Sequence, residues 1–131
     1  MIKLWNETLE TGMPAIDEQH KELFRQVEIL FESDNVDRVT KTLDFLAKYV
    51  EKHFNDEQQL HQKTQYPKAE LHKKMHLEFT NTYKTLKQDY DSSGAKLQVM
   101  LKINKIASEW LRNHIMVHDK EFAAYYKTQK N

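Results

Sequence analysis

The sequence of 131 residues contains no cysteine and only two glycines and two prolines. The absence of cysteine excludes disulfide bonds and thiolate metal sites such as iron–sulfur clusters, so any bound metal must be held by nitrogen and oxygen ligands. The shortage of glycine, of proline and of runs rich in Val, Ile and Thr favours helices over strands. We therefore expect an all-α fold, with residues 1–131 forming one domain.

The chain also lacks a long apolar run and an excess of charge of either sign. Met1 to Met13 contains no apolar segment as long as a signal peptide or membrane span, so we expect no membrane insertion and a cytoplasmic location. Lys plus Arg equals Asp plus Glu, at 20 each, and no basic block suggests a nucleic-acid partner. With zero formal net charge and no obvious exposed apolar face, a monomer is expected.

Apolar residues recur at steps of three and four in four successive stretches, which predicts four amphipathic helices. The expected ranges are 17–33, 36–64, 68–90 and 95–118. The turns between them are short, so neighbouring helices should be antiparallel. They fall at Ser33-Asp34-Asn35, Tyr66-Pro67 and Ser92-Ser93-Gly94. The predicted fold is therefore an up-down-up-down antiparallel four-helix bundle over residues 16–118.

Segments at both ends of the chain are expected to pack on this bundle. The N-terminal arm, residues 1–15, should be extended and should pack through Leu4 and Trp5, and Asp17 should cap the first helix. Residues 119–131 should form a closing segment with a short aromatic-rich helix. Among the residues expected to face the core on the third and fourth helices are Leu71, Leu97 and Val117.

Histidine and carboxylate residues fall on the inward side of every predicted helix. Residues four apart lie on one helix face about one turn apart, and antiparallel alternation brings all four groups to the same end of the bundle. A glutamate on an apolar stripe is costly unless it meets a positive charge or a metal. The pattern therefore predicts a binuclear metal site. Its candidate ligands are His20, His53, Glu57, His72, His76, His114 and Asp119.

The spacing of the last two candidates requires a local departure from regular helix. His114 and Asp119 are five apart, about 140° from each other around an ideal helix, so we expect the helix to end or bulge there. Two further histidines, His61 and His118, extend the ligand motifs by one turn. We interpret both as non-ligands near the bundle end or a solvent path.

Counting coordination positions gives a first indication of function. Two octahedral ions have twelve positions between them. Five histidines fill five, two bridging carboxylates fill four, and one bridging oxygen fills two. One position is left open, which suits a single small molecule, most plausibly O2. A set rich in imidazole with carboxylate bridges suits iron better than calcium or magnesium.

The pattern resembles the hemerythrins, a family of non-haem di-iron proteins that bind O2, and more narrowly the single-domain bacteriohemerythrins. The likeness rests on the Trp-led arm, on Asp17-Glu18-Gln19-His20, and on the H-x3-E, H-x3-H and H-x4-D motifs. It covers essentially the whole chain, and every ligand position matches. The resemblance implies that two iron ions form the cofactor.

The resemblance also implies a role for each residue. His72, His76 and His114 would fill the coordination sphere of one iron. His20 and His53 would bind the other iron and leave its sixth position open. Glu57 and Asp119 would bridge the pair together with an oxo or hydroxo group. The run around His114 resembles the apolar O2 pocket of the family. The expected pocket residues are Trp110, Leu111, Ile115 and Phe54.

The resulting hypothesis is reversible O2 binding, for oxygen storage or for delivery to an oxygen-consuming enzyme. No Glu-x-x-His pair of the kind used by carboxylate-rich di-iron oxygenases aligns with the site, so a carrier is favoured over an enzyme. Three alternatives stay open at this point. They are a di-iron oxygen sensor, an enzyme that handles peroxide or nitric oxide at the same site, and a store of zinc or iron.

Overall fold

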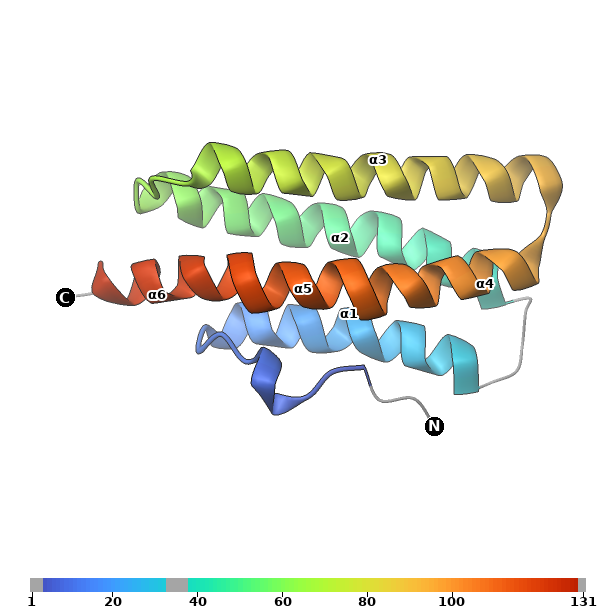
Figure 1. Ribbon diagram of the computed structural model, residues 1–131, viewed down its shortest axis with the longest axis horizontal. Helices are drawn as coiled ribbons and strands as arrows, with labels where there is room; N and C mark the ends of the chain where they lie inside the picture. Colours follow the sequence, from blue (N-terminus) through green and yellow to red (C-terminus); the bar gives the residue numbers. More distant parts are fainter. Residues whose placement is uncertain (1–3, 33–37, 130–131) are drawn as a thin grey trace.

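Four long helical segments, packed antiparallel, form the fold of the computed structural model (Figure 1). It describes residues 4–32 and 38–129, with the side chains of Phe31 and Glu32 excepted. The first three segments are α1 (Pro14–Glu32), α2 (Arg38–Lys63) and α3 (Ala69–Ser93). The all-α bundle predicted from the sequence is confirmed, and the described residues contain no strand. The turn expected at residues 33–35 and the start of helix two at Val36 lie outside the described residues.

The fourth segment is a continuous helical rod built from regular and widened turns. It comprises α4 (Lys96–Lys105), the π-helical η2 (Ile106–Leu111), α5 (Arg112–His114), the π-helical η3 (Ile115–Asp119) and α6 (Lys120–Thr128). The sequence predicted a boundary between the bundle and the closing segment after residue 118. The helix does not break there, since Asp119 has helical φ and ψ. The rod therefore continues without a break from Asp119 through α6 (Figure 1).

A bulge between His114 and Asp119 was predicted from their spacing, and η3 confirms it. In a π-helical turn the backbone bonds from i to i+5, so residues five apart come onto the same side. Asp119 is consequently buried, whereas Val117, expected to face inward, is 50% exposed. The second π-helical segment, η2, was not predicted.

The N-terminal arm packs along α1 and contains a short 3-10 helix, η1 (Glu7–Leu9). Leu4 is buried, as expected, and Trp5 packs partly buried against the same core. α1 begins at Pro14, so Asp17 lies in its first turn and is not the cap that was predicted. Its carboxylate instead accepts bonds from the backbone N–H of Thr11, at 2.9 Å, and from the Thr11 hydroxyl, at 2.8 Å. Asp17 thereby fastens the arm to the helix.

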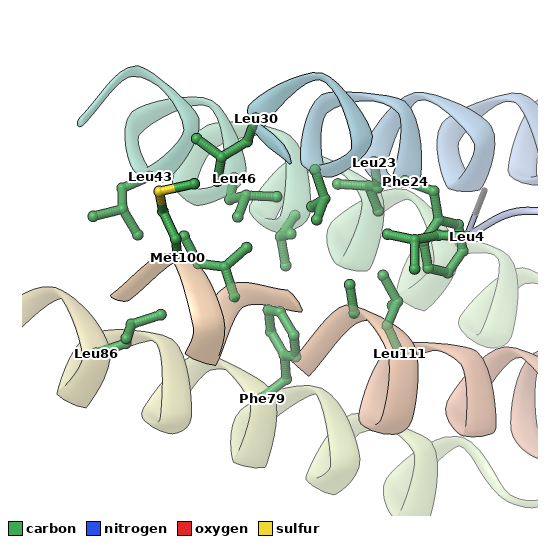
Figure 2. Close-up of a cluster of buried hydrophobic side chains, with 14 of the residues drawn as sticks. Leu4, Leu23, Phe24, Leu30, Leu43, Leu46, Phe79, Leu86, Met100 and Leu111 are labelled. Atoms are coloured by element: carbon green, nitrogen blue, oxygen red, sulfur yellow. The ribbon is translucent and has the colours of Figure 1, made fainter. Parts of the chain in front are cut away.

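The apolar interior has two parts. The larger core runs along the bundle and includes Leu30, Leu43 and Met100, which approach one another from three helices (Figure 2). A smaller core closes the opposite end through Met13, Ile16, Tyr66, Phe122 and Ala123. The buried polar residues described below are contributed by the helix segments between these two clusters.

Two other residues expected in the core are exposed. Leu71 is 48% exposed because His72, His76 and Phe79 occupy the inward face of α3. Leu97 is 63% exposed because it stands in the first turn of α4, where Val99 takes the inward position.

Candidate metal centre

The seven predicted ligand side chains lie together at one end of the bundle. α1 and α3 contribute residues from their N-terminal halves, whereas α2 and the fourth rod contribute residues from their C-terminal halves, so antiparallel packing brings the four groups to one level. Every side chain is at most 3% exposed. The residues are His20, His53, Glu57, His72, His76, His114 and Asp119.

These residues form two overlapping groups, in each of which the potential ligand atoms lie within 4.8 Å of one another. One group holds three histidines and the other holds two. Both carboxylates belong to both groups. The first group is Glu57, His72, His76, His114 and Asp119, and the second is His20, His53, Glu57 and Asp119.

Glu57 spans the two groups with its two oxygens. Its Oε1 atom lies 2.8 Å from Nε2 of His72 and 3.2 Å from Nε2 of His76. Its Oε2 atom faces the other way, 4.0 Å from Nε2 of His53. One carboxylate oxygen is therefore directed toward each cluster of imidazoles, as a bridging ligand requires.

Asp119 repeats this arrangement from the opposite side of the bundle. Its Oδ1 atom lies 2.9 Å from Nε2 of His72 and 3.3 Å from Nε2 of His114. Its Oδ2 atom lies 3.1 Å from Nε2 of His20. The widened turn of η3 produces this geometry, because it places a residue five positions after His114 next to the His114 ring.

The imidazoles direct nitrogen atoms at one another across the site. Nε2 of His20 lies 3.1 Å from Nε2 of His53, and Nε2 of His72 lies 3.0 Å from Nε2 of His114. Two neutral imidazole lone pairs repel each other at this distance unless a proton or a cation lies between them. The facing nitrogens therefore form a set of donors suited to a cation.

The proton of His53 can be assigned from its neighbours. The carboxylate of Asp56 can only accept, so the amide nitrogen of Gln19 donates to it, at 3.0 Å. The carbonyl oxygen of Gln19 then lies 2.6 Å from Nδ1 of His53. Because a carbonyl can only accept, Nδ1 carries the proton and Nε2 presents its lone pair to the site.

Aromatic faces and a second glutamine hold the three-histidine group. The Gln58 side chain lies 3.3 Å from Nδ1 of His76. Phe54 stacks on the His76 ring with centroids 3.8 Å apart and an interplanar angle of 5°. Trp110 stacks on His114 at 4.7 Å and 9°. These flat contacts fix the planes of both imidazoles.

Burial and neighbouring charges shift the pKa values of these side chains in different directions. Burial lowers the pKa of His53 to about 4 and, with the charges of nearby histidines, lowers the pKa of His76 to about 2. Burial alone would also lower the pKa of His72, but the carboxylates of Asp119 and Glu57 close to its Nε2 atom outweigh it and raise that pKa to about 9. Asp119 has its pKa held well below the usual range by His114, His20 and His72, against the effect of burial.

The two extra histidines lie beside this set and belong to neither group. His61 is 1% exposed and packs against Tyr66, His72 and Phe122, so it does not line the solvent path that the sequence suggested. Burial lowers its pKa to about 4. His118 is half-buried, with its ring centroid 5.5 Å from that of His114.

The residues predicted to form an apolar pocket occupy different positions around the site. Phe54 and Trp110 lie against ligands of the three-histidine group, and Ile115 is fully buried. Leu111 lines an apolar cavity of about 30 Å³. Other walls of that cavity are Leu23 and Val50. Leu23, Val50 and Leu111 are three residues from His20, His53 and His114 respectively.

Sequence reasoning did not identify the partners of the outer imidazole nitrogens. Gln19 and Gln58 each immediately adjoin a candidate ligand in the sequence, but adjacent positions on one helix point in different directions. Gln19 reaches His53 only because α1 packs against α2. The burial of His61 could have been predicted from the sequence, since His61 lies four residues after Glu57 on the same helix face.

The buried polar atoms of the site fit a pair of bound cations. Both oxygens of Glu57, both oxygens of Asp119 and Nε2 of His76 have no well-formed hydrogen bond among the described residues. Each such buried atom costs about 1–3 kcal/mol if it stays unpaired. Five imidazole nitrogens and four carboxylate oxygens suit a borderline transition metal better than calcium or magnesium. The fold and site thus define a helical-bundle protein with an internal cluster able to hold metal.

Comparison with known proteins identifies the family. Residues 11–126 match the family model described as hemerythrin HHE cation binding domain. The chain is 36% identical over 111 residues to the myohemerythrin of Theromyzon tessulatum, covering 85% of this chain and 82% of that protein. It is 33% identical over 115 residues to the hemerythrin of Themiste dyscrita, covering 88% and 86%. The bacteriohemerythrin of Stenotrophomonas maltophilia is 28% identical over 136 residues, covering 99% and 85%. The chain belongs to the hemerythrin family, as its motifs predicted.

The comparisons and the site together support a protein of a metal-binding and O2-binding family. Within residues 4–32 and 38–129, no helix is both long enough and apolar enough to cross a membrane.

Proposed function

We propose that this protein binds O2 reversibly at a di-iron centre and serves in oxygen storage or in delivery to an oxygen-consuming enzyme, without catalysing a reaction itself. The observation that carries the proposal is the pair of overlapping ligand groups that share Glu57 and Asp119. A single-metal site would need only one group. Two carboxylates with one oxygen directed at each group support a binuclear centre.

The two groups differ in a way that supports one site of O2 binding. His72, His76 and His114 would hold one iron, and His20 and His53 would hold the other, with both carboxylates shared. The second group has one histidine fewer, so it leaves a coordination position for a small molecule. When bound, the iron pair would supply the electrons and the open position that O2 binding requires.

The donor set favours reversible binding over oxidation chemistry. It contains five neutral imidazoles and only two carboxylates, whereas anionic donors stabilise the higher oxidation states that oxygenases use. The outer partner of His53 is the neutral Gln19 and not a carboxylate. A carboxylate there would raise the basicity of the imidazole further.

The apolar cavity supports binding without turnover. A water molecule needs roughly 10–15 Å³ of such space and two to four polar partners, so a cavity of about 30 Å³ with apolar walls has room for a diatomic molecule and is unfavourable for water. Tyr83 is the one hydroxyl-bearing residue in its lining, and its hydroxyl donates to the backbone oxygen of Leu43 at 2.5 Å. The cavity therefore offers no free proton donor from the described lining residues.

A route for a gas from the surface is also available. A groove of about 830 Å³ opens between α2 and α3. Leu46, Val50, Phe79 and Tyr83 line both this groove and the inner cavity, so the same side chains separate the two spaces. Rotation of these side chains would let a small apolar molecule pass.

Oxygen cycling of the iron-loaded protein tests the proposal. The reduced protein should develop a visible absorption band in air and lose it under argon over repeated cycles. Immediate and permanent conversion to the oxidised form would instead favour an enzyme that handles peroxide or nitric oxide. An unloaded mutant lacking Glu57 and Asp119 serves as the spectral blank.

A further inference from the structure

His61 is a buried polar side chain that the proposed centre does not use. It is 1% exposed, and neither ring nitrogen has a hydrogen-bond partner among the described residues. Leaving both unpaired is unfavourable, since each buried polar atom without a partner destabilises the fold. A leucine or methionine would fill the same space without this cost. The presence of histidine here therefore calls for a partner.

His72 also has a ring nitrogen without a hydrogen-bond partner. Its Nε2 atom faces Glu57 and Asp119, but its outer nitrogen, Nδ1, has no partner within the described parts of the chain. A histidine that binds metal through one nitrogen almost always donates its other N–H to an acceptor, which fixes the tautomer and the ring orientation. Gln19 has this role for His53, whereas the Gln58 atom beside Nδ1 of His76 is the amide nitrogen, which donates.

The two deficient rings touch. The centroids of His61 and His72 are 4.5 Å apart, with an interplanar angle of 41°. Ring pairs slightly farther apart in this same structure bring nitrogens within hydrogen-bond distance. His20 and His53 do so with centroids 4.7 Å apart and nitrogens 3.1 Å apart. The rings are therefore close enough for a bond between nitrogen atoms, which forms once a ring turns from the orientation in which these atoms are unpaired.

Neither of the other two aromatic rings packed against His61 in the described parts of the chain gives it a hydrogen-bond partner. Phe122 meets the His61 ring edge-on at 4.3 Å and has no polar atom. Tyr66 packs at 5.2 Å, and its hydroxyl is directed to Glu121. These two aromatic residues and His72 all pack against the ring of His61.

We propose that His61 is a positioning residue that accepts a hydrogen bond from Nδ1–H of His72 and thereby keeps Nε2 of His72 directed at the metal centre. The bond satisfies one nitrogen on each ring at once. It acts on the one histidine whose Nε2 lies within 3 Å of both bridging carboxylates. This inference rests on the proposed function, because it needs His72 to bind metal.

Three variants and one metal probe test it. His61→Leu removes the acceptor while keeping an apolar side chain, and His61→Gln restores an acceptor. His118→Leu is the matched control, because His118 also lies beside His72 but its ring centroid is 6.4 Å away. Each protein is loaded with Zn²⁺, which is diamagnetic, and is labelled with ¹⁵N-histidine. The readouts are the Nδ1–H resonance of His72, retention of Zn²⁺ against a chelator, and the melting temperature without metal.

We expect His61→Leu to shift or abolish the His72 Nδ1–H resonance and to weaken metal retention about tenfold or more. Its metal-free melting temperature should stay equal or rise, since the unpaired nitrogens are gone. His61→Gln should recover most of the retention, and His118→Leu should match wild type. A role in packing alone predicts the opposite combination, a lower melting temperature with the resonance unchanged, and that result would overturn the inference. If wild type itself retains no metal, the proposed function fails instead.

Discussion

Nδ1 of His53 lies 2.6 Å from the side-chain oxygen of Gln19, and the amide nitrogen of Gln19 lies 3.0 Å from Asp56. This chain of two hydrogen bonds runs from the partly exposed Asp56 to an imidazole that is almost entirely buried. It fixes both the tautomer and the ring orientation of His53 before any metal binds. The two-histidine group is therefore preorganised by a residue on the neighbouring helix.

Replacing Gln19 should weaken this group selectively. Gln19→Leu removes the acceptor for His53, and loss of such a partner typically costs 10–100-fold in metal affinity. Chelator competition should show one of two metals released early while the other stays bound. Gln26→Leu is the control on the same helix, since the Gln26 side chain donates to Glu22 and to no candidate ligand among the described residues. Equal loss of both metals in Gln19→Leu would contradict the assignment.

Removal of a terminal ligand and of a bridging ligand should have different consequences. His20→Ala removes a ligand of the two-histidine group, so about one metal per chain and the ability to bind O2 should be lost together. Glu57→Gln removes a charge from both groups, so both metals should bind more weakly. Metal analysis after gel filtration measures the difference. Exposed Glu51→Gln on the same helix should keep full metal content.

The metal-free protein should be most stable near pH 6.5. Burial holds the folded pKa of His53 at about 4, below its unfolded value of 6.5, so the unfolded state binds protons first as pH falls. Stability is lost between pH 6.5 and 4, by roughly 3 kcal/mol from this group. His61 acts in the same direction.

On the alkaline side, His72 has the opposite effect. Its folded pKa of about 9 is raised, so its contribution is complete below pH 6.5 and is lost as pH rises through 9. Urea unfolding of the metal-free protein from pH 4 to 10 measures the loss of stability on both the acid and the alkaline side. A flat profile from pH 5 to 9 would show that these side chains are not buried as described.

Enlarging the apolar cavity should reduce stability and shorten the life of the oxygenated protein. Leu111→Ala removes a buried side chain from the cavity wall, which typically costs about 2–5 kcal/mol. Space for water beside the centre should also speed irreversible oxidation. Thermal unfolding and the decay of the oxygenated spectrum measure the two effects. Leu97→Ala, at a site 63% exposed, should change neither.

Much of this architecture could be predicted from the sequence because its determinants are local. Steps of three and four residues predict the helices, and short turns predict their antiparallel order. The five-residue spacing between His114 and Asp119 predicted a distorted helix, and the π-helical η3 confirms it. Val117 was wrongly predicted to face inward, because that prediction continued the apolar stripe of the helix at regular steps, and the widened turn exposes it instead.

Contacts between helices could not be predicted in the same way. The pairing of Gln19 with His53 depends on the rotation of α1 against α2, and no spacing within one helix encodes that rotation. The same holds for His61 and His72, which lie on different helices. Asp17 was expected to cap α1 but fastens the arm instead, because Pro14 starts the helix earlier.

The most direct test of the central claim is metal analysis combined with oxygen cycling on one purified sample. The account predicts close to two irons per chain and a visible absorption band that appears in air, disappears under argon and returns in air. One zinc per chain, or two irons whose spectrum changes once in air and never reverts, would contradict it.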